Sequence, residues 1–147
     1  MTIDLAIISD RLQRLDSYLA TLARLADLPH DDLIDDSIPL GSTERYLHLA
    51  IECCLDIANH LVAGLQLREP ENYADVFAVL TEANILPDHF LPMAQQMARF
   101  RNRLVHVYWD IDAEVIYTIL HTRVDEFEHF KGYILKYLDE QGFIPTP

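Results

Sequence analysis

The sequence predicts an all-α fold, a bundle of four or five helices in one domain over residues 1–147. Three observations favour this class. Apolar residues recur at three- and four-residue steps along most of the chain, which is the period of a helix. Only 4 glycines are present, too few for the repeated tight turns of an all-β sandwich. Half of the residues are hydrophobic, so 147 residues can bury one core and offset the entropy of the chain.

A long first helix is predicted over residues 3–26, because leucine and isoleucine alternate at steps of three and four. The members of this seam are Leu5, Ile8, Leu12, Leu15, Leu19, Leu22 and Leu25. Residues 27–41 contain Pro29, Pro39, Gly41 and two acidic pairs, so we expect a polar connection without a periodic face. Ser42 or Thr43 is then expected to cap the second helix.

The second helix is predicted to extend to Leu65 and to be the most buried, because its apolar stripe is wide. A short third helix should begin at Tyr73 and end near Asn84, a residue that tolerates the left-handed conformation. The fourth helix should begin at His89 and continue through Leu104.

A last helix is expected from a cap at Asp110 or Asp112 to Gly142. Its beginning, residues 115–119, is rich in residues that favour strands, so this part of the helix is the weakest expectation.

Several function classes are disfavoured by composition. No glycine-rich phosphate-binding motif is present, and no apolar run reaches the roughly 18 residues of a membrane span. The adjacent Cys53 and Cys54 fit a reducing compartment, so we expect a soluble cytoplasmic protein with no membrane association.

Glu126 and His129 have the spacing of half a di-iron site, but the other half is missing, so we expect no metal and no cofactor. The net charge of −13 disfavours a broad surface for DNA.

Against this acidity, three arginines gather within five positions, at Arg99, Arg101 and Arg103. Arg101 also begins an Arg-x-x-x-x-His-x-Tyr pattern with His106 and Tyr108. On an ideal helix, His106 lies about 140° around from Arg101, so a regular helix separates the two side chains. Their convergence on one phosphate requires a distortion or helix end here, or a second copy of the chain.

The residue types of this pattern fit RNA cleavage without a metal ion. Attack of a 2′-hydroxyl on its own phosphate needs a base, an acid and a cation, yet the segment has one histidine. A two-fold axis beside the segment would supply two, which favours the option of a homodimer. The alternative is that Arg101 and His106 only bind the last carbonyl groups of a helix.

The same segment resembles the HepT-type ribonucleases of the HEPN superfamily. The resemblance covers most of the chain in order, through residues 44–52, 56–60, 73–77 and 100–112. It implies an all-α homodimer with a cleft at the interface, across which the two motifs face each other. It also implies metal-independent RNase activity and a role as the toxin of a toxin–antitoxin pair. It also implies an MntA-type minimal nucleotidyltransferase as the antitoxin, which transfers AMP to the tyrosine that corresponds to Tyr108.

Carried onto this chain, the resemblance makes Arg101 and His106 the catalytic pair. His106 would be general acid or base, Arg101 would stabilise the charged phosphate, Asn102 would orient or polarise, and Tyr108 would line the cleft as the control point. The competing hypothesis is an all-α dimeric binding or scaffold subunit of a nucleotidyltransferase without RNase activity, which the acidity favours.

Two further groups have open roles. Arg99 and Arg103 either contact RNA phosphates or pair with the surplus acidic side chains. Glu52, Asp56, Asn59 and His60 form a polar edge on the second helix, and we expect a structural hydrogen-bond network there rather than a cleft wall.

Overall fold

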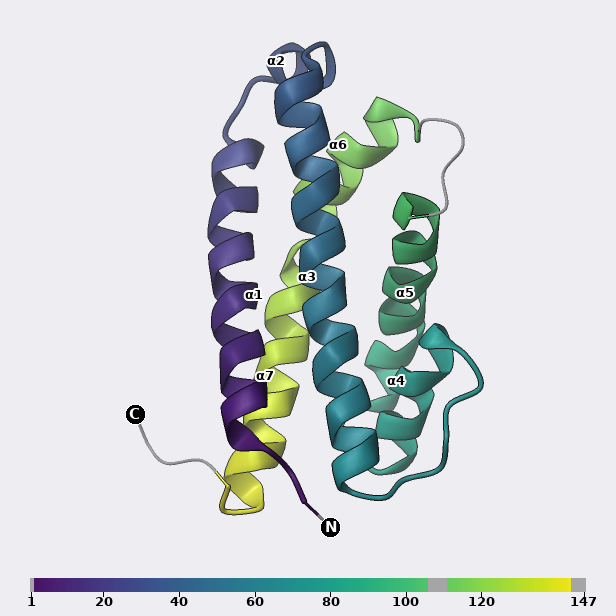
Figure 1. Ribbon diagram of the computed structural model, residues 1–147. Coiled ribbons are helices and arrows are strands. Elements are labelled where there is room, and N and C mark those ends of the chain that lie inside the picture. Colours follow the sequence, from purple (N-terminus) through teal and green to yellow (C-terminus); the bar gives the residue numbers. More distant parts are fainter. Residues whose placement is uncertain (1, 106–110, 144–147) are drawn as a thin grey trace.

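The computed structural model describes residues 2–105 and 111–143, and the regular structure of these residues is entirely helical, which confirms the all-α prediction. The elements are α1 (Leu5–Ala26), α2 (His30–Ile34), α3 (Ser37–Gly64), α4 (Tyr73–Glu82), the 3₁₀ turn η1 (Asp88–Phe90), α5 (Leu91–Val105), α6 (Ala113–Thr122) and α7 (Asp125–Glu140). Figure 1 shows an elongated bundle with α3 in the middle, α1 along one side and α5 along the other. None of the helices in residues 2–105 and 111–143 is long and apolar enough to span a membrane.

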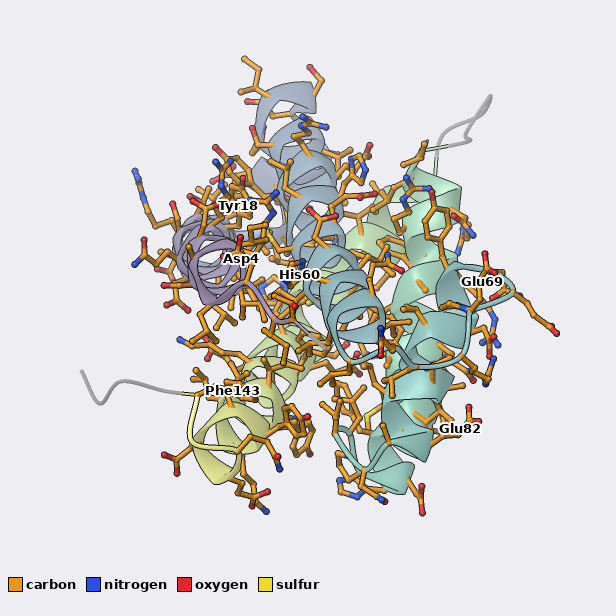
Figure 2. The ribbon with its side chains drawn as sticks, turned by 60° about the horizontal axis from the view of Figure 1, so that its bottom comes forward. Asp4, Tyr18, His60, Glu69, Glu82 and Phe143 are labelled. Atoms are coloured by element: carbon orange, nitrogen blue, oxygen red, sulfur yellow. The ribbon has the colours of Figure 1, made fainter. Side chains whose placement is uncertain are left out.

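Helix α3 forms the centre of the core, as its wide apolar stripe predicts. Its buried residues face α1 on one side and α4 and α5 on the other; they are Thr43, Leu47, Ala50, Ile51, Cys53, Cys54, Leu55, Ile57, Ala58, Leu61 and Val62. The predicted seam of α1 is buried at Ile8, Leu12, Leu15, Leu19 and Leu22. Asp4 caps α1, and its backbone amide donates to Nε2 of His60 on α3 at 2.9 Å, so the two residues lie next to each other in Figure 2.

The predicted irregular connection over residues 27–41 is wrong. It holds the short helix α2 and the first turn of α3, whose cap is Asp36 rather than Ser42 or Thr43. The Asp36 carboxylate accepts from the amide of Ile38 at 3.0 Å. Pro39 then lies in the first turn, where a missing amide hydrogen has no cost to the helix. Thr43 is buried inside the helix, and its hydroxyl donates to the carbonyl of Pro39 at 2.8 Å.

The single last helix is also wrong, because the chain breaks it at residues 123–124 into α6 and α7. The break lets α6 pack against α2 and α3, while α7 turns to lie along α1. Asp112 caps α6, accepting from the amide of Glu114 at 2.9 Å, whereas Asp110 lies outside the described residues. Residues 115–119 are helical, since burial of Ile116 and Leu120 outweighs their strand propensity.

The third and fourth predicted helices are confirmed with small changes at their ends. Asn84 follows α4 with a φ of 61°, the expected left-handed conformation. Asp88 begins the 3₁₀ turn η1, and Pro92 lies in the first turn of α5. Figure 1 shows that the loop after α3 rises beside α5, so α4 begins alongside the C-terminal half of α5 and runs antiparallel to it. This arrangement brings Tyr73 to Arg101 and to the same pocket as Arg99.

Candidate functional site

Arg101 lies in the last turns of α5 and points toward the middle of α3. Its side chain is only 13% exposed, and its Nε donates to Oε1 of Glu52 at 2.5 Å. Its Nη1 donates to Oδ1 of the neighbouring Asn102 at 3.2 Å. Glu52 therefore fixes the direction of the guanidinium group from a separate helix.

Two further residues of α3 lie in a row beside that carboxylate. His48, one turn before Glu52, has its Nε2 at 3.3 Å from the same Oε1. Arg45, a further turn back, donates from Nη1 to Nδ1 of His48 at 3.3 Å. Oε1 of Glu52 therefore lies between Nε of Arg101 and Nε2 of His48, and contact with both side chains restricts the rotation of the carboxylate.

The opposite side of the guanidinium group faces an aromatic ring. The Cζ of Arg101 lies 4.6 Å from the ring centroid of Tyr73, within the range of a cation–π contact. Tyr73 is the first residue of α4 and is 46% exposed. The Nη2 group of Arg101 has no hydrogen-bond partner among the described residues. Its donors are therefore available to a ligand.

Arg99 and Arg103 flank Arg101 on α5, one turn apart. Within residues 2–105 and 111–143, neither forms an ion pair, so the expected alternative of acidic partners is not found there. The guanidinium of Arg103 lies 6.0 Å from the ring of Phe100 on its own helix. Among the described residues, the last turns of α5 therefore carry two positive charges without an acidic partner, in a chain whose net charge is −13.

His106 and Tyr108 lie outside the described residues, so the approach of His106 to Arg101 remains a prediction. The polar edge of α3 divides into two functions. Glu52 binds Arg101, whereas Asp56 and His60 bind α1, at Arg11 and at the amide of Asp4. The structural expectation for this edge is thus right for Asp56 and His60, but Glu52 belongs to the candidate site.

Sequence reasoning missed His48 and Tyr73. The spacing of Arg45, His48 and Glu52 at three and four residues carries a signal, because such residues are neighbours on a helix surface. Tyr73 carries no such local signal, since it meets Arg101 only through the packing of α4 on α5.

Other reactive groups do not contribute to this site. The described part of the chain contains no group of three His, Cys, Asp or Glu side chains placed to hold a metal ion. Cys53 and Cys54 are free and buried in α3. Burial raises the pKa of the Cys53 thiol to about 11, so it stays protonated at neutral pH and is a poor nucleophile.

The sequence of the chain is similar to that of known ribonucleases. The family described as Ribonuclease HepT-like matches residues 8–134. The chain is 26% identical over 136 residues to the tRNA nuclease HepT of Aphanizomenon flos-aquae, covering 92% of each protein. It is 28% identical over 100 residues to the mRNA nuclease HepT of Shewanella oneidensis, covering 68% of this chain and 71% of that protein.

Solved structures share the fold. The cytosolic protein YutE from Bacillus subtilis has a TM-score of 0.83 and 23% identity, covering 98% of this chain and 96% of its own. A tri-AMPylated HEPN toxin from Shewanella oneidensis, in complex with an MNT antitoxin, has a TM-score of 0.80 and 23% identity. That match covers 88% of this chain and 97% of the toxin.

Proposed function

Because this chain belongs to the HepT-like ribonuclease family, we propose that it is the RNase toxin of a toxin–antitoxin pair and cleaves RNA without a metal ion. The observation that carries the proposal is the state of Arg101. Its guanidinium is largely buried and fixed by Glu52, yet Nη2 has no partner among the described residues. A buried arginine with unused donors fits a site for the charge of a phosphate in its transition state.

In the proposed reaction, the 2′-oxygen of a ribose attacks the adjacent phosphorus while a base removes the 2′-hydroxyl proton. The bond to the 5′-oxygen breaks, and an acid returns a proton to that oxygen. The products are a 2′,3′-cyclic phosphate and a 5′-hydroxyl end. His106 supplies acid or base, Arg101 stabilises the charge on the non-bridging oxygens, and Asn102 orients Arg101. Arg99 and Arg103 contact neighbouring RNA phosphates.

The decisive experiment incubates the purified, unmodified protein with total RNA in EDTA and maps the cut ends. We expect cleavage that persists in EDTA and leaves 2′,3′-cyclic phosphates. His106→Ala should lower the rate by about 10²–10⁴ while the protein stays folded. Loss of cleavage in EDTA contradicts the metal-independent mechanism, and full activity in His106→Ala contradicts the role of that histidine.

The acid and the base together require two histidines, so we propose a homodimer with both Arg101–Tyr108 motifs facing one cleft. Equilibrium sedimentation should give about twice the 17.0 kDa chain mass. Mixing His106→Ala chains with Arg101→Ala chains tests site sharing. The mixed dimer keeps one histidine and one arginine in its cleft. Renewed activity would show that this pair from opposite chains is sufficient, continued loss agrees with a need for both histidines, and a fully active monomer excludes the shared cleft.

The proposed antitoxin is an MntA-type minimal nucleotidyltransferase that adds AMP to Tyr108. The AMPylated toxin bound to an MNT antitoxin, which shares this fold, supports the proposal. A nucleotide beside His106 would exclude RNA by its bulk and its negative charge. We expect toxin produced with this partner in the cytoplasm to be heavier by one or more AMP units and inactive. Tyr108→Phe should still cleave RNA, and it should stay toxic even when the partner is present. AMP found on another residue would contradict Tyr108 as the site of modification.

The second candidate function is an inactive dimeric scaffold subunit for the nucleotidyltransferase. The net charge of −13 favours it, because such a charge weakens binding to long RNA. AMP-free wild-type protein that binds the partner but cuts no RNA would establish this function in place of the RNase.

A further inference from the structure

A polar pocket of about 400 Å³ opens between the start of α4 and the C-terminal half of α5, next to Arg101. The wall from α5 carries Gln95, Arg99 and Asn102, which share one face of the helix at steps of four and three. The wall from α4 carries Asn72 and Tyr73. Glu71 and Asp75 also line it, so the pocket combines amide side chains and an aromatic ring with one arginine and two carboxylates.

Tyr73 is the feature of this pocket that points to a ligand. Arg101 covers one face of its ring, with Cζ 4.6 Å from the centroid, while 46% of the residue remains exposed. Exposed aromatic rings in positively charged grooves are platforms on which the bases of single-stranded RNA stack. A tyrosine held in this way by the arginine of the candidate site is well placed for such a base.

The polar groups of the pocket keep donors for a base edge. Asn72 uses its Oδ1 to accept from the amide of Asp75 at 2.8 Å, and Asn102 uses its Oδ1 to accept from Arg101, so both side-chain NH₂ groups remain available. Gln95 has no hydrogen-bond partner among the described residues. Carboxamide side chains bind the donor and acceptor pattern of bases, adenine in particular.

Of the two acidic residues that line the pocket, Glu71 and Asp75, Asp75 is neutralised by an arginine. The Asp75 carboxylate is bound by Nη1 and Nη2 of Arg68, at 2.7 and 3.0 Å, and by the amide of Glu71 at 2.9 Å. Arg99, by contrast, has no ion pair among the described residues, so its charge is available to a phosphate.

We propose that this pocket binds one nucleoside of single-stranded RNA, with its base stacked on Tyr73 and its phosphate on Arg99. In the proposed function, on which this inference rests, Arg101 contacts the scissile phosphate. Because Arg101 also contacts Tyr73, the bound nucleoside lies next to the bond that is cut. The pocket is then the base-binding subsite of the ribonuclease.

The test compares binding of two uncleavable probes, a 2′-O-methyl adenosine decamer and an abasic decamer with the same backbone, by fluorescence anisotropy. The wild-type protein and Tyr73→Phe should prefer the adenosine decamer by about ten-fold, the usual scale of base stacking. Tyr73→Ala should lose this preference. Arg99→Ala should weaken the binding of both probes equally and retain the preference for the adenosine decamer. Ile38→Ala, at an exposed position of α3, is the surface control.

The ratio of the two affinities separates stacking from support of Arg101. If Tyr73→Ala weakens both probes equally and the preference survives, the ring only holds Arg101 and the subsite is overturned. A wild-type protein that cleaves total RNA but binds both decamers equally also overturns the subsite and leaves the proposed function intact. A protein that neither cleaves RNA nor binds either probe overturns both. Binding of the nucleotidyltransferase partner that depends on Tyr73 without any base preference assigns the pocket to a protein contact instead.

Discussion

Arg68 and Arg101 are both bound by carboxylates, but only one of them is fully used. Arg68 has all three nitrogens engaged, by Asp75 and by Glu82, over distances of 2.6 to 3.1 Å. Arg101 has one carboxylate partner, Glu52, and its Nη2 has no partner among the described residues. Arg68 is nevertheless the more exposed of the two side chains, at 44% against 13%.

The difference indicates how the chain divides its few cations between structure and binding. Arg68 ties the loop after α3 to both ends of α4, and its two acidic partners leave that cluster with a net negative charge. These partners raise the pKa of Arg68 further, so its charge is permanent but fully compensated. In Figure 2, Glu69 and Glu82 both lie on this outer side of the molecule. The compensated Arg68 offers a phosphate little charge, whereas among the described residues Arg99 and Arg103 have no ion pair and Nη2 of Arg101 has no hydrogen-bond partner.

The largest expected effect separates the two arginines by activity. Arg101→Ala should lower RNA cleavage by at least about 10²-fold, because transition-state charge loses its donor. Arg68→Ala should lower cleavage by less than about ten-fold, because Arg68 acts only indirectly, by neutralising Asp75 in the wall of the pocket. Cleavage of total RNA in EDTA measures both, with circular dichroism as the folding control. Equal losses in the two variants would contradict the distinction.

Glu52 and Glu82, which bind Arg101 and Arg68 respectively, should differ in the same way in their effect on cleavage, but by a smaller factor. Glu52→Gln should lower kcat by about ten-fold, because a neutral amide holds Arg101 less firmly in its reacting position. KM for RNA should not rise, since the variant removes a negative charge near the substrate. Glu82→Gln is the matched control and should change neither constant. A rise in KM with unchanged kcat in Glu52→Gln would show that Glu52 acts in binding rather than in positioning.

Salt dependence sharpens the comparison for the arginines without ion pairs. Arg99→Ala and Arg103→Ala should each reduce the slope of log affinity against log salt by about one, because each removes one phosphate contact. Arg68→Ala should leave the slope unchanged. The measurement is a salt titration of binding to the uncleavable adenosine decamer. An unchanged slope in Arg99→Ala would place that residue outside the RNA path.

The smallest effect concerns acid stability at the Arg68 cluster. The guanidinium of Arg68 lowers the pKa of Asp75 from 3.8 to about 2, so the folded state favours the ionised form. The stability that this gives is present above the unfolded pKa and is lost as the pH falls toward about 2.

Asp75→Asn should therefore lower the free energy of unfolding near neutral pH, and its difference from the wild type should shrink steadily in acid. Urea unfolding at a series of pH values measures this, with Arg68→Ala as the variant that should show the same trend. A difference that stays constant down to acidic pH would mean that the ion pair contributes nothing and that only packing changed.

Local patterns in the sequence were sufficient for the parts of the fold that depend on one helix at a time. The seam of α1 and the stripe of α3 predicted which residues are buried, because the period of a helix decides which side chains share a face. Local rules failed where two start or stop signals compete. Asp36 caps α3 ahead of Ser42 and Thr43, and the break at residues 123–124 follows from packing partners that are distant in sequence.

The sequence by itself determined the all-α class, the helical faces and the gathering of Arg99, Arg101 and Arg103 on one helix, since each depends on residues a few positions apart. Only the tertiary structure decided which of these arginines is held, by what, and beside which pocket. Glu52 is 49 residues from Arg101, and Tyr73 meets it only because the loop after α3 carries the start of α4 back along α5. Such contacts are set by how amphipathic helices bury their apolar faces against one another, which no local spacing specifies.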